Sequence, residues 1–226
     1  AIAFINIQLV YYCMPKDSTI LIFCAHSDDE AVGMGGAIAK FHSEGKRVIK
    51  VVFSFGESSH PHFQEHVVIN RRLEETESAS RAIGITKTIF FGMRDTKVKE
   101  DAEKINAVAK VKDIINEYKP ERIFVTSAID PHPDHQAVNK TVLKSVDSLR
   151  KSYPVYEFEV WNIVKENKPM MYVDITPFYK KKMDYTRMFS SQWQWLYALR
   201  IPVWLRTRYY GSKHKCKYAE KFYKVR

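Results

Sequence analysis

The chain has 226 residues, a length that suits one domain whose core can form without disulfide or metal staples. Apolar residues make up 45% and charged residues 27% of the sequence, a balance that excludes a disordered chain. Since no uncharged apolar run reaches about 18 residues, we expect no membrane-embedded protein. The three distant cysteines, Cys13, Cys24 and Cys216, outline no disulfide framework and indicate a reducing, cytoplasmic compartment.

The net charge of +10 is unevenly distributed along the chain. Residues 165–226 carry 15 Lys and Arg against four acids, whereas residues 1–164 carry 21 Lys and Arg against 22 acids. A domain that binds nucleic acid over its whole surface would be basic throughout. The distribution therefore argues against nucleic acid as the main partner and assigns the excess positive charge to the C-terminal quarter.

Strand-like and helix-like segments alternate through the first 150 residues. Continuous apolar runs predict buried strands, and apolar residues spaced by three or four positions predict helices. In chain order we expect a strand at 19–25, a helix at 35–44, a strand at 48–55, a helix at 70–83, a short strand at 88–91, a helix at 102–118, a strand at 122–126 and a helix at 134–149. Two later strands are expected at 155–161 and 170–175.

This alternation is typical of right-handed βαβ units. It predicts a single α/β domain with a Rossmann-like, mainly parallel sheet flanked by helices. Residues 1–176 form the predicted core, and residues 177–226 form a basic, aromatic C-terminal extension without a linker. We expect Pro202 to break any single long helix in that extension.

Two polar clusters follow two of the predicted strands. His26-Ser27-Asp28-Asp29-Glu30 comes after the strand at 19–25, and Asp130-Pro131-His132-Pro133-Asp134-His135 comes after the strand at 122–126. Ligands of open α/β sheets bind outside the carboxyl ends of the strands, so we expect both clusters to converge there. Either cluster alone is equally consistent with a solvated loop that caps the following helix. Together, at matching ends of two strands, they predict one functional site.

The residue types of the two clusters fit an open metal site. Catalytic zinc takes three protein ligands from His and carboxylate side chains and keeps one position for water. His26 and Asp29 can supply two ligands and a histidine of the second cluster the third, and the lack of cysteine ligands argues against a structural site. Asp28 can accept a proton from the metal-bound water, and the remaining histidine can stabilise charge on the substrate oxygen.

These motifs resemble those of the LmbE-like (PIG-L) de-N-acetylases. Segment 26–30 is similar to the family's AHPDDE motif, with Ser27 in place of proline, and segment 132–135 is similar to its HPDH motif. The chemistry does not require the proline, so we expect Ser27 to be tolerated. The supporting similarities are Gly35-Gly36, the segment 71–75 leading to Gly84, Asp95, Ser191-Gln192 and the closing segment 218–222.

The resemblance implies a role for each matching residue of the two motifs. His26, Asp29 and His135 would bind Zn²⁺. Asp28 would be the general base, and His132 would polarise the substrate carbonyl or act as the acid. The implied activity is a zinc-dependent hydrolase that removes the N-acetyl group from an N-acetylglucosamine-containing substrate by means of metal-activated water.

The resemblance also implies substrate contacts and partners. Arg72 and Asp95 would match the family's contacts to sugar hydroxyls. The partner would be an N-acetylated amino sugar, with the group attached to the sugar left open. The assembly would be a homo-oligomer, a trimer or a multiple of trimers.

Other features of the chain leave alternatives open. Aromatic and basic residues interleave between 192 and 210, a composition that suits peripheral contact with an anionic membrane or single-stranded nucleic acid. Packing in the core and between subunits explains the same composition, and we favour it. The rival to the enzyme is thus a non-catalytic binding module that uses this tail, and a third alternative is the same metal chemistry on a different N-acyl substrate.

A histidine-rich segment lies between the second strand and the second helix. His60, His62 and His66 are close enough in sequence to form a second metal site. We favour instead a polar loop that lines or gates the substrate pocket, because long loops of α/β enzymes commonly carry that function.

Overall fold

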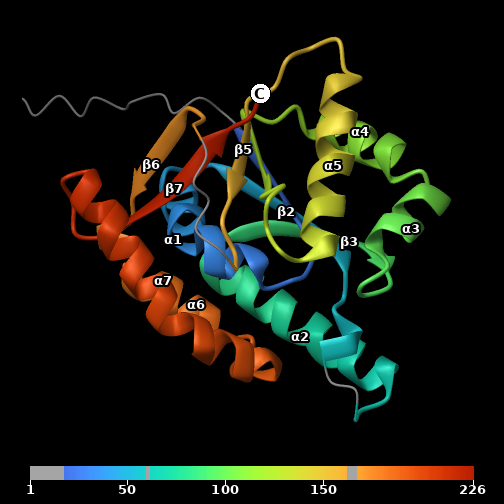
Figure 1. Cartoon of the computed structure of the whole chain (residues 1–226), viewed down its shortest axis with the longest axis horizontal. Helices are drawn as coiled ribbons and strands as arrows, with labels where there is room; N and C mark the ends of the chain where they lie inside the picture. Colours follow the sequence, from blue (N-terminus) through green and yellow to red (C-terminus); the bar gives the residue numbers. More distant parts are fainter. Residues whose placement is uncertain (1–17, 60–61, 162–166) are drawn as a thin grey trace, which may run out of the picture.

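The computed structural model describes residues 18–59, 62–161 and 167–226. Its seven strands are β1 (Thr19–Cys24), β2 (Arg47–Ser54), β3 (Ile85–Met93), β4 (Arg122–Thr126), β5 (Val155–Phe158), β6 (Met170–Asp174) and β7 (Ala219–Lys224). They form one sheet in the order β3-β2-β1-β4-β5-β7-β6 (Figure 1). The first five strands of that order are parallel, and β7 is antiparallel to both β5 and β6. The predicted α/β class with a mainly parallel, Rossmann-like sheet is confirmed.

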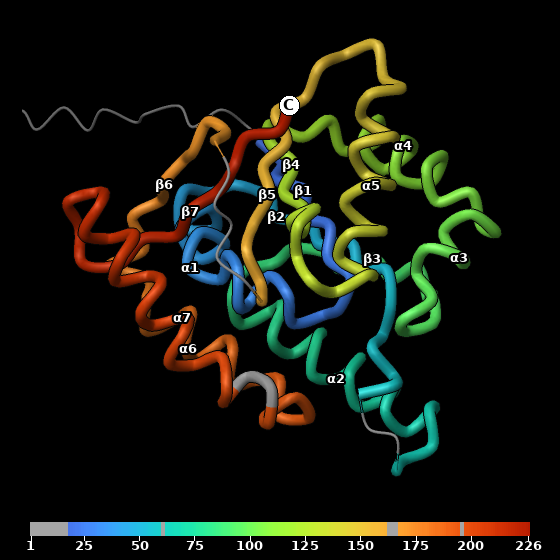
Figure 2. The backbone as a smooth tube through the Cα atoms, viewed as in Figure 1, coloured from blue at the N-terminus to red at the C-terminus, as the bar shows by residue number. Residues whose placement is uncertain are grey.

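Helices cover both faces of this sheet. They are α1 (Asp29–Ser43), α2 (Glu65–Ile83), α3 (Val98–Lys104), α4 (Ala107–Tyr118), α5 (Pro133–Asp147), α6 (Tyr179–Arg187) and α7 (Trp193–Lys213). Figure 2 shows α1, α2, α6 and α7 on one side of the sheet and α3, α4 and α5 on the other. Each layer has its own apolar core, and β1 contributes alternate residues to both, which is why the whole strand is an apolar run.

Local sequence signals set the ends of two helices that border the site. Helix α5 begins with Pro133, and the ring of His132 at its N-cap accepts a hydrogen bond from the backbone N–H of Asp134. Helix α2 ends at Gly84, whose φ of 101° is a left-handed conformation that favours glycine. A β-carbon at Gly84 would also lie only 2.2 Å from the ring of His42, so both the backbone and the packing require glycine.

Two expectations about helices were wrong. The single helix predicted at 102–118 is two helices, α3 and α4, separated at Asn106, whose φ of 50° is left-handed. Pro202 does not break a helix, because α7 runs through it from Trp193 to Lys213. Both Pro202 and Ala198, four residues earlier, are exposed, so the carbonyl that the proline leaves without a donor can be hydrated.

Residues 177–226, an extension according to the sequence, belong to the same core in the structure. Strand β7 lies within the sheet between β5 and β6, so the end of the chain completes the fold. The carboxylate of Glu220 on β7 accepts hydrogen bonds from the backbone N–H groups of Gly36 and Ala37 at 3.0 and 2.7 Å. It also forms a buried ion pair with Lys182 on α6, at 2.5 Å. These contacts join the C-terminal segment to the first helix.

No helix within the described part of the chain combines the length and the apolar character needed to cross a membrane.

Candidate active site

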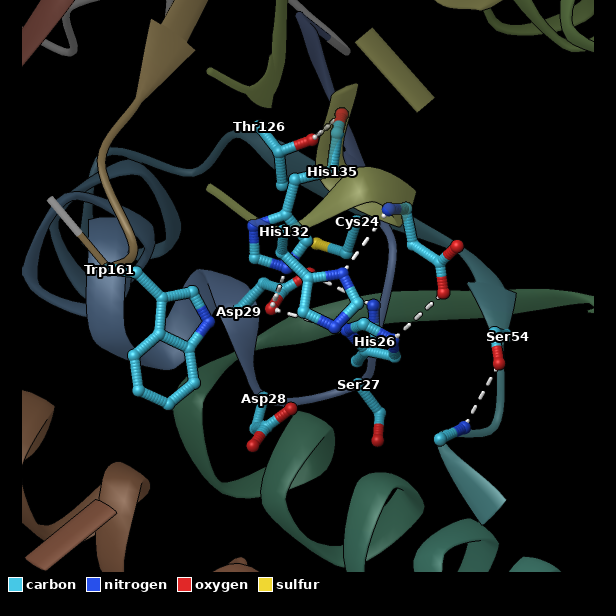
Figure 3. A network of polar contacts seen from close by, with 12 residues as sticks. Cys24, His26, Ser27, Asp28, Asp29, Ser54, Thr126, His132, His135 and Trp161 are labelled. Atoms are coloured by element: carbon cyan, nitrogen blue, oxygen red, sulfur yellow. Dashed lines mark hydrogen bonds and ion pairs between the residues drawn. The ribbon is translucent and has the colours of Figure 1, made fainter. Parts of the chain in front are cut away.

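The two polar clusters meet at the carboxyl ends of β1 and β4, which are neighbours in the sheet. From β1 the chain returns to β2 and β3 on one side, whereas β4 leads to β5 on the other, so a crevice opens at this switch point. Figure 3 shows the imidazole rings of His26, His132 and His135 gathered around Asp29. Their ring centroids lie 4.8 to 5.5 Å apart. The fold therefore brings the predicted site residues of both motifs together.

Three potential metal ligands converge within this cluster. One ligand atom each from His26, Asp29 and His135 lies within 4.8 Å of the other two. The His135 Nε2 to Asp29 Oδ1 distance is 3.1 Å, and the His26 Nδ1 to Asp29 Oδ1 distance is 3.8 Å. Ligand atoms around a tetrahedral zinc with bonds of about 2.1 Å are about 3.4 Å apart. The spacing of the three residues thus fits a zinc ion.

The surroundings of His135 support the same conclusion. Its ring is fully buried, and among the described residues neither ring nitrogen has a hydrogen-bond partner of acceptable geometry, although carboxylate oxygens of Asp29 and Asp130 lie at 3.1 and 3.0 Å. A buried polar atom without a partner is costly unless something else satisfies it. A cation bound between His135 and Asp29 would supply that partner. Two imidazoles and one carboxylate are also the donor set of open catalytic zinc sites.

The electrostatics of the cluster favour a cation at the same point. Burial alone would lower the pKa of His26, but hydrogen bonds to the surrounding carboxylates raise it well above its usual value. Burial would also lower the pKa of His135, yet Asp29 and Asp130 raise it to about 9. Despite burial, the two imidazoles hold the pKa of Asp29 well below its usual range. The carboxylates thus place negative charge where a divalent ion can replace the ring protons.

Asp28 lies beside the potential ligands without being one of them. It contributes to the wall of the pocket, and its Oδ1 accepts a hydrogen bond from Nη2 of Arg72 at 3.3 Å. The same nitrogen donates to the Ser27 hydroxyl at 3.4 Å, so the serine that replaces the motif proline contacts Arg72. The guanidinium is buried and its Nε has no hydrogen-bond partner among the described residues. Arg72 therefore orients Asp28 from within the wall of the pocket.

Asp95, expected from the resemblance to contact the sugar, also contacts His26. Its Oδ1 is 3.0 Å from His26 Nε2, and its backbone N–H donates to Oε1 of Glu57 at 2.7 Å. Burial tends to raise the pKa of Asp95, but the hydrogen bond to His26 lowers it overall. A carboxylate on the far nitrogen of a ligand histidine fixes the orientation of the ring. The contact between Asp95 and His26 is one that the sequence did not indicate.

His132 differs from the other two histidines. Its Nδ1 accepts the hydrogen bond of Asp134 N–H, at 3.2 Å, so a neutral ring carries its proton on Nε2. Burial and the neighbouring rings of His26 and His135 lower the pKa of His132. The neutral ring can donate a hydrogen bond into the pocket.

Asp130 connects several parts of the site, a role that the sequence did not reveal. Its Oδ1 accepts the backbone N–H of His132 at 3.0 Å and lies 3.0 Å from His135 Nδ1, while its Oδ2 accepts the backbone N–H of Trp161 at 3.1 Å. The carboxylate is fully buried. It therefore holds His135 from behind and ties the end of the β5 loop to the site. Its place within the second polar cluster was the only sequence signal for it.

The cluster forms the floor of a pocket of about 320 Å³. His26, Asp28, Asp29, Arg72, Asp95 and His132 line it, whereas His135 lies beneath. Further lining residues that sequence reasoning did not assign include Val160, Trp161, Gln192 and Leu199. Only Gln192 had a signal, its similarity to the family's SQ pair.

The loop after β2 also reaches this pocket. Gly56, Ser58 and Ser59 line it, as expected for a loop that borders the substrate. His60 lies outside the described residues. Beside His26, Asp29 and His135, the described residues hold a second possible metal-binding group in the same cluster, made of His26, Asp95, His132 and Asp134. His62 and His66 are exposed and contribute to neither group.

Comparison with known protein families assigns the chain that carries this site to one of them. A family model described as PIG-L, GlcNAc-PI de-N-acetylase, matches residues 21–146, which is more than half of the chain and includes both motifs. The chain belongs to the PIG-L family. The predicted LmbE-like membership is confirmed, and with it the enzyme class, a deacetylase that hydrolyses amide bonds.

Relatives of this PIG-L protein span most of its length. Diacetylchitobiose deacetylase of Thermococcus kodakarensis is 25% identical over 222 residues, which cover 89% of this chain and 80% of the relative. The 4-oxalmesaconate hydratase of Pseudomonas putida is 27% identical over 210 residues, covering 84% and 80%. The structure of N,N'-diacetylchitobiose deacetylase from Pyrococcus horikoshii has the same fold, with a TM-score of 0.78, 22% identity and coverage of 92% of this chain and 84% of that one.

Proposed function

We propose that this PIG-L protein is a zinc-dependent hydrolase that removes the N-acetyl group from an N-acetylglucosamine-containing substrate. The observation that carries the proposal is the convergence of His26, Asp29 and His135 at the floor of a pocket whose wall holds Asp28. If the second motif served only to start helix α5, its histidine side chains could lie in solvent. Here the ring of His135 is buried against Asp29 instead.

His26, Asp29 and His135 would hold the zinc ion. Bound there, zinc supplies Lewis-acid chemistry that activates water and polarises the acetamide carbonyl. Asp130 behind His135 and Asp95 behind His26 keep the two rings in the orientation that ligation needs.

Asp28 acts as the general base. Its carboxylate faces the pocket, and the hydrogen bond from Arg72 holds it in place to accept the proton of the attacking water. The protonated carboxyl then returns that proton to the nitrogen of the leaving amine. One group thus serves both halves of the amide hydrolysis, and the products are acetate and a free amino sugar.

His132 stabilises the charge that develops on the acetamide oxygen. Because its Nδ1 accepts a backbone hydrogen bond, its Nε2–H is the donor available to that oxygen. Arg72 and Asp95 both line the wall of the pocket, where their guanidinium and carboxylate groups would bind sugar hydroxyls.

Amine release measured on a panel of N-acetylated sugars tests the proposal. The panel contains N-acetylglucosamine, diacetylchitobiose and inositol-linked N-acetylglucosamine. We expect about one zinc per chain, amine release that stops on chelation, and recovery when zinc is restored. A zinc-loaded chain that is inactive on every sugar would point to another N-acyl substrate or to hydratase chemistry like that of the Pseudomonas relative. A chain that binds no metal would favour the non-catalytic binding module.

We further propose a cytoplasmic homo-oligomer, a trimer or a multiple of trimers, as the family resemblance implies. Cys24 and Cys216 are both free thiols, which is consistent with a reducing compartment. Light scattering on the zinc-loaded chain gives its molar mass directly, and a monomer would contradict this part of the proposal.

A further inference from the structure

Helix α7 exposes an apolar face that the core does not use. Six large side chains of this helix are each between 45% and 71% exposed: Trp193, Tyr197, Ile201, Trp204, Leu205 and Tyr209. Their spacing of three or four positions places them along one side of the helix. The opposite side is already packed, since Val203, Arg206 and Tyr210 are buried against the rest of the fold. The fold therefore leaves much of this face of α7 without packing partners among the described residues.

The same surface carries positive charge. Helix α7 contains no Asp or Glu, and Arg200, Arg208 and Lys213 are exposed on it. A groove of about 710 Å³ between α6 and α7 combines Lys180, Arg187 and Arg200 with the rings of Tyr179, Tyr197 and Trp204. The acid that lines this groove, Asp184, already pairs with Lys180 and Arg187 at 2.8 Å each. An anion in the groove would thus meet a net positive surface.

We propose that the outer face of α7, with the groove between α6 and α7, is a docking surface for an anionic lipid bilayer. Aromatic side chains are favoured at the depth of the headgroups, and Lys and Arg attract the phosphates of anionic lipids. The helix lies in the plane of the interface, since it does not meet the requirements for crossing the bilayer. Figure 1 shows α7 on the outside of the molecule, along α6 and away from α3, α4 and α5.

Charge favours a bilayer over a contact of this face with the same face of a second copy, and the interfaces of the proposed trimer would pair two different surfaces instead. A twofold contact of this face with itself would bring Arg200, Arg208 and Lys213 against the same residues of the other copy. Like charges across an interface are repulsive, whereas an anionic bilayer neutralises all of them.

The docking surface adjoins the mouth of the substrate pocket. Leu199 of α7 lines both that pocket and the apolar pocket beside Trp193 and Tyr197. Trp161 and Val160 line the substrate pocket and also the pocket on the other side of α7, next to Leu205. A docked enzyme would therefore hold its pocket at the level of the headgroups. Docking itself does not depend on the proposed hydrolysis.

Flotation of the zinc-loaded full chain with vesicles tests the proposal. Vesicles of phosphatidylcholine with about 30% phosphatidylserine are compared with pure phosphatidylcholine vesicles at low and at high salt. We expect binding to the anionic vesicles, weaker binding at high salt, and a blue shift of tryptophan fluorescence on binding. The variant R200Q/R208Q/K213Q should lower the partition coefficient on anionic vesicles about a hundredfold.

Two further variants complete the design. K99Q/K110Q/K140Q removes the same charge from exposed positions of α3, α4 and α5, and should bind like the unchanged chain. Ile201→Ser should weaken binding at every salt concentration, because it removes apolar contact and not charge. None of the residues substituted in these variants lines the substrate pocket, so their zinc content and their activity on a water-soluble sugar should stay unchanged.

Four results would overturn the proposal. The first is equal binding to both kinds of vesicle, and the second is an equal loss of vesicle binding in the two charge variants. The third is tighter binding to single-stranded DNA than to anionic vesicles. The fourth is an oligomer that dissociates when Ile201→Ser is introduced, together with no vesicle binding by the unchanged chain. A chain that is inactive on sugars but still binds anionic vesicles would refute the proposed function and leave the docking surface in place.

Discussion

Asp28 and Asp29 are neighbours in sequence but face different partners in the site. Asp29 is buried between the rings of His26 and His135, at distances of 3.8 and 3.1 Å. Asp28 faces the pocket and accepts a hydrogen bond from Arg72. Substitution of Asp28 should therefore lower turnover, whereas removal of a metal ligand such as Asp29 should lower metal binding.

Asp28→Asn should reduce turnover by about 10²–10⁴-fold, the usual contribution of a general base, because the amide cannot accept the proton of water. The amide oxygen can still accept the hydrogen bond of Arg72, so the pocket keeps its shape. Amine release and the zinc content of the same sample are the measurements. Full turnover with stoichiometric zinc would show that another group is the base.

His135→Ala should abolish stoichiometric zinc binding, because two ligands remain of the three that converge. His62→Ala is the matched control, since His62 is exposed and lies outside both potential metal-binding groups. Metal analysis after dialysis distinguishes the two variants. Equal zinc content in both would move the metal away from this cluster.

At the scale of elements, a buried charge pair joins three parts of the fold. Lys182 of α6 donates hydrogen bonds to the carbonyl of Val32 on α1 and to the carboxylate of Glu220 on β7. That carboxylate also accepts the backbone N–H groups of Gly36 and Ala37 on α1. Both charged side chains are almost completely buried. The loss of one partner would leave the other charged in a low-dielectric core.

Lys182→Met should lower the free energy of unfolding by about 3–5 kcal/mol, because it leaves Glu220 buried without its cation. The double variant Lys182→Met/Glu220→Gln should recover part of that loss, because no buried charge remains and the glutamine oxygen still accepts one of the two α1 N–H groups. Lys180→Met, at an exposed position of the same helix, should change stability by no more than about 0.5 kcal/mol. Urea denaturation measures all three, and a double variant no more stable than Lys182→Met would contradict the explanation.

At the scale of the whole molecule, the C-terminal segment is a structural part of the sheet. Strand β7 pairs with β5 on one side and β6 on the other, and α6 and α7 cover the core cluster that contains α1. Without this segment, β5 and β6 would lack a common neighbour and the apolar side chains of α1 would be exposed.

A chain that ends at residue 176 should therefore fail to form a cooperatively folded domain, although it retains both metal motifs. We expect it to bind a hydrophobic dye, to lose a sharp thermal transition and to bind zinc weakly if at all. Circular dichroism and dye fluorescence beside the full chain provide the measurements. A truncated chain with a sharp transition and stoichiometric zinc would show that the core is complete without β7.

Local patterns were sufficient for most of the elements and for the metal motifs. Strands such as β1 and β4 are short apolar runs, and the two motifs follow them directly, so a few neighbouring residues encode both. The break between α3 and α4 escaped prediction, because the apolar spacing continues across Asn106, an exposed residue whose type tolerates the left-handed backbone. Asp130 and Trp161 likewise gained their roles from a contact across 31 positions.

The sequence by itself determined the parallel α/β plan, the place of the site at the strand ends and the set of residues able to bind a metal. These depend on apolar spacing and on motifs of a few residues. The tertiary structure decided how the basic tail is used, because contacts such as Gly36 to Glu220 span 184 positions and no local pattern encodes them. It pairs Lys182, Arg206 and Lys221 with buried acids, whereas Arg200, Arg208 and Lys213 of α7 stay at the surface. The net charge alone could not separate these two groups, since burial and pairing depend on the folded arrangement.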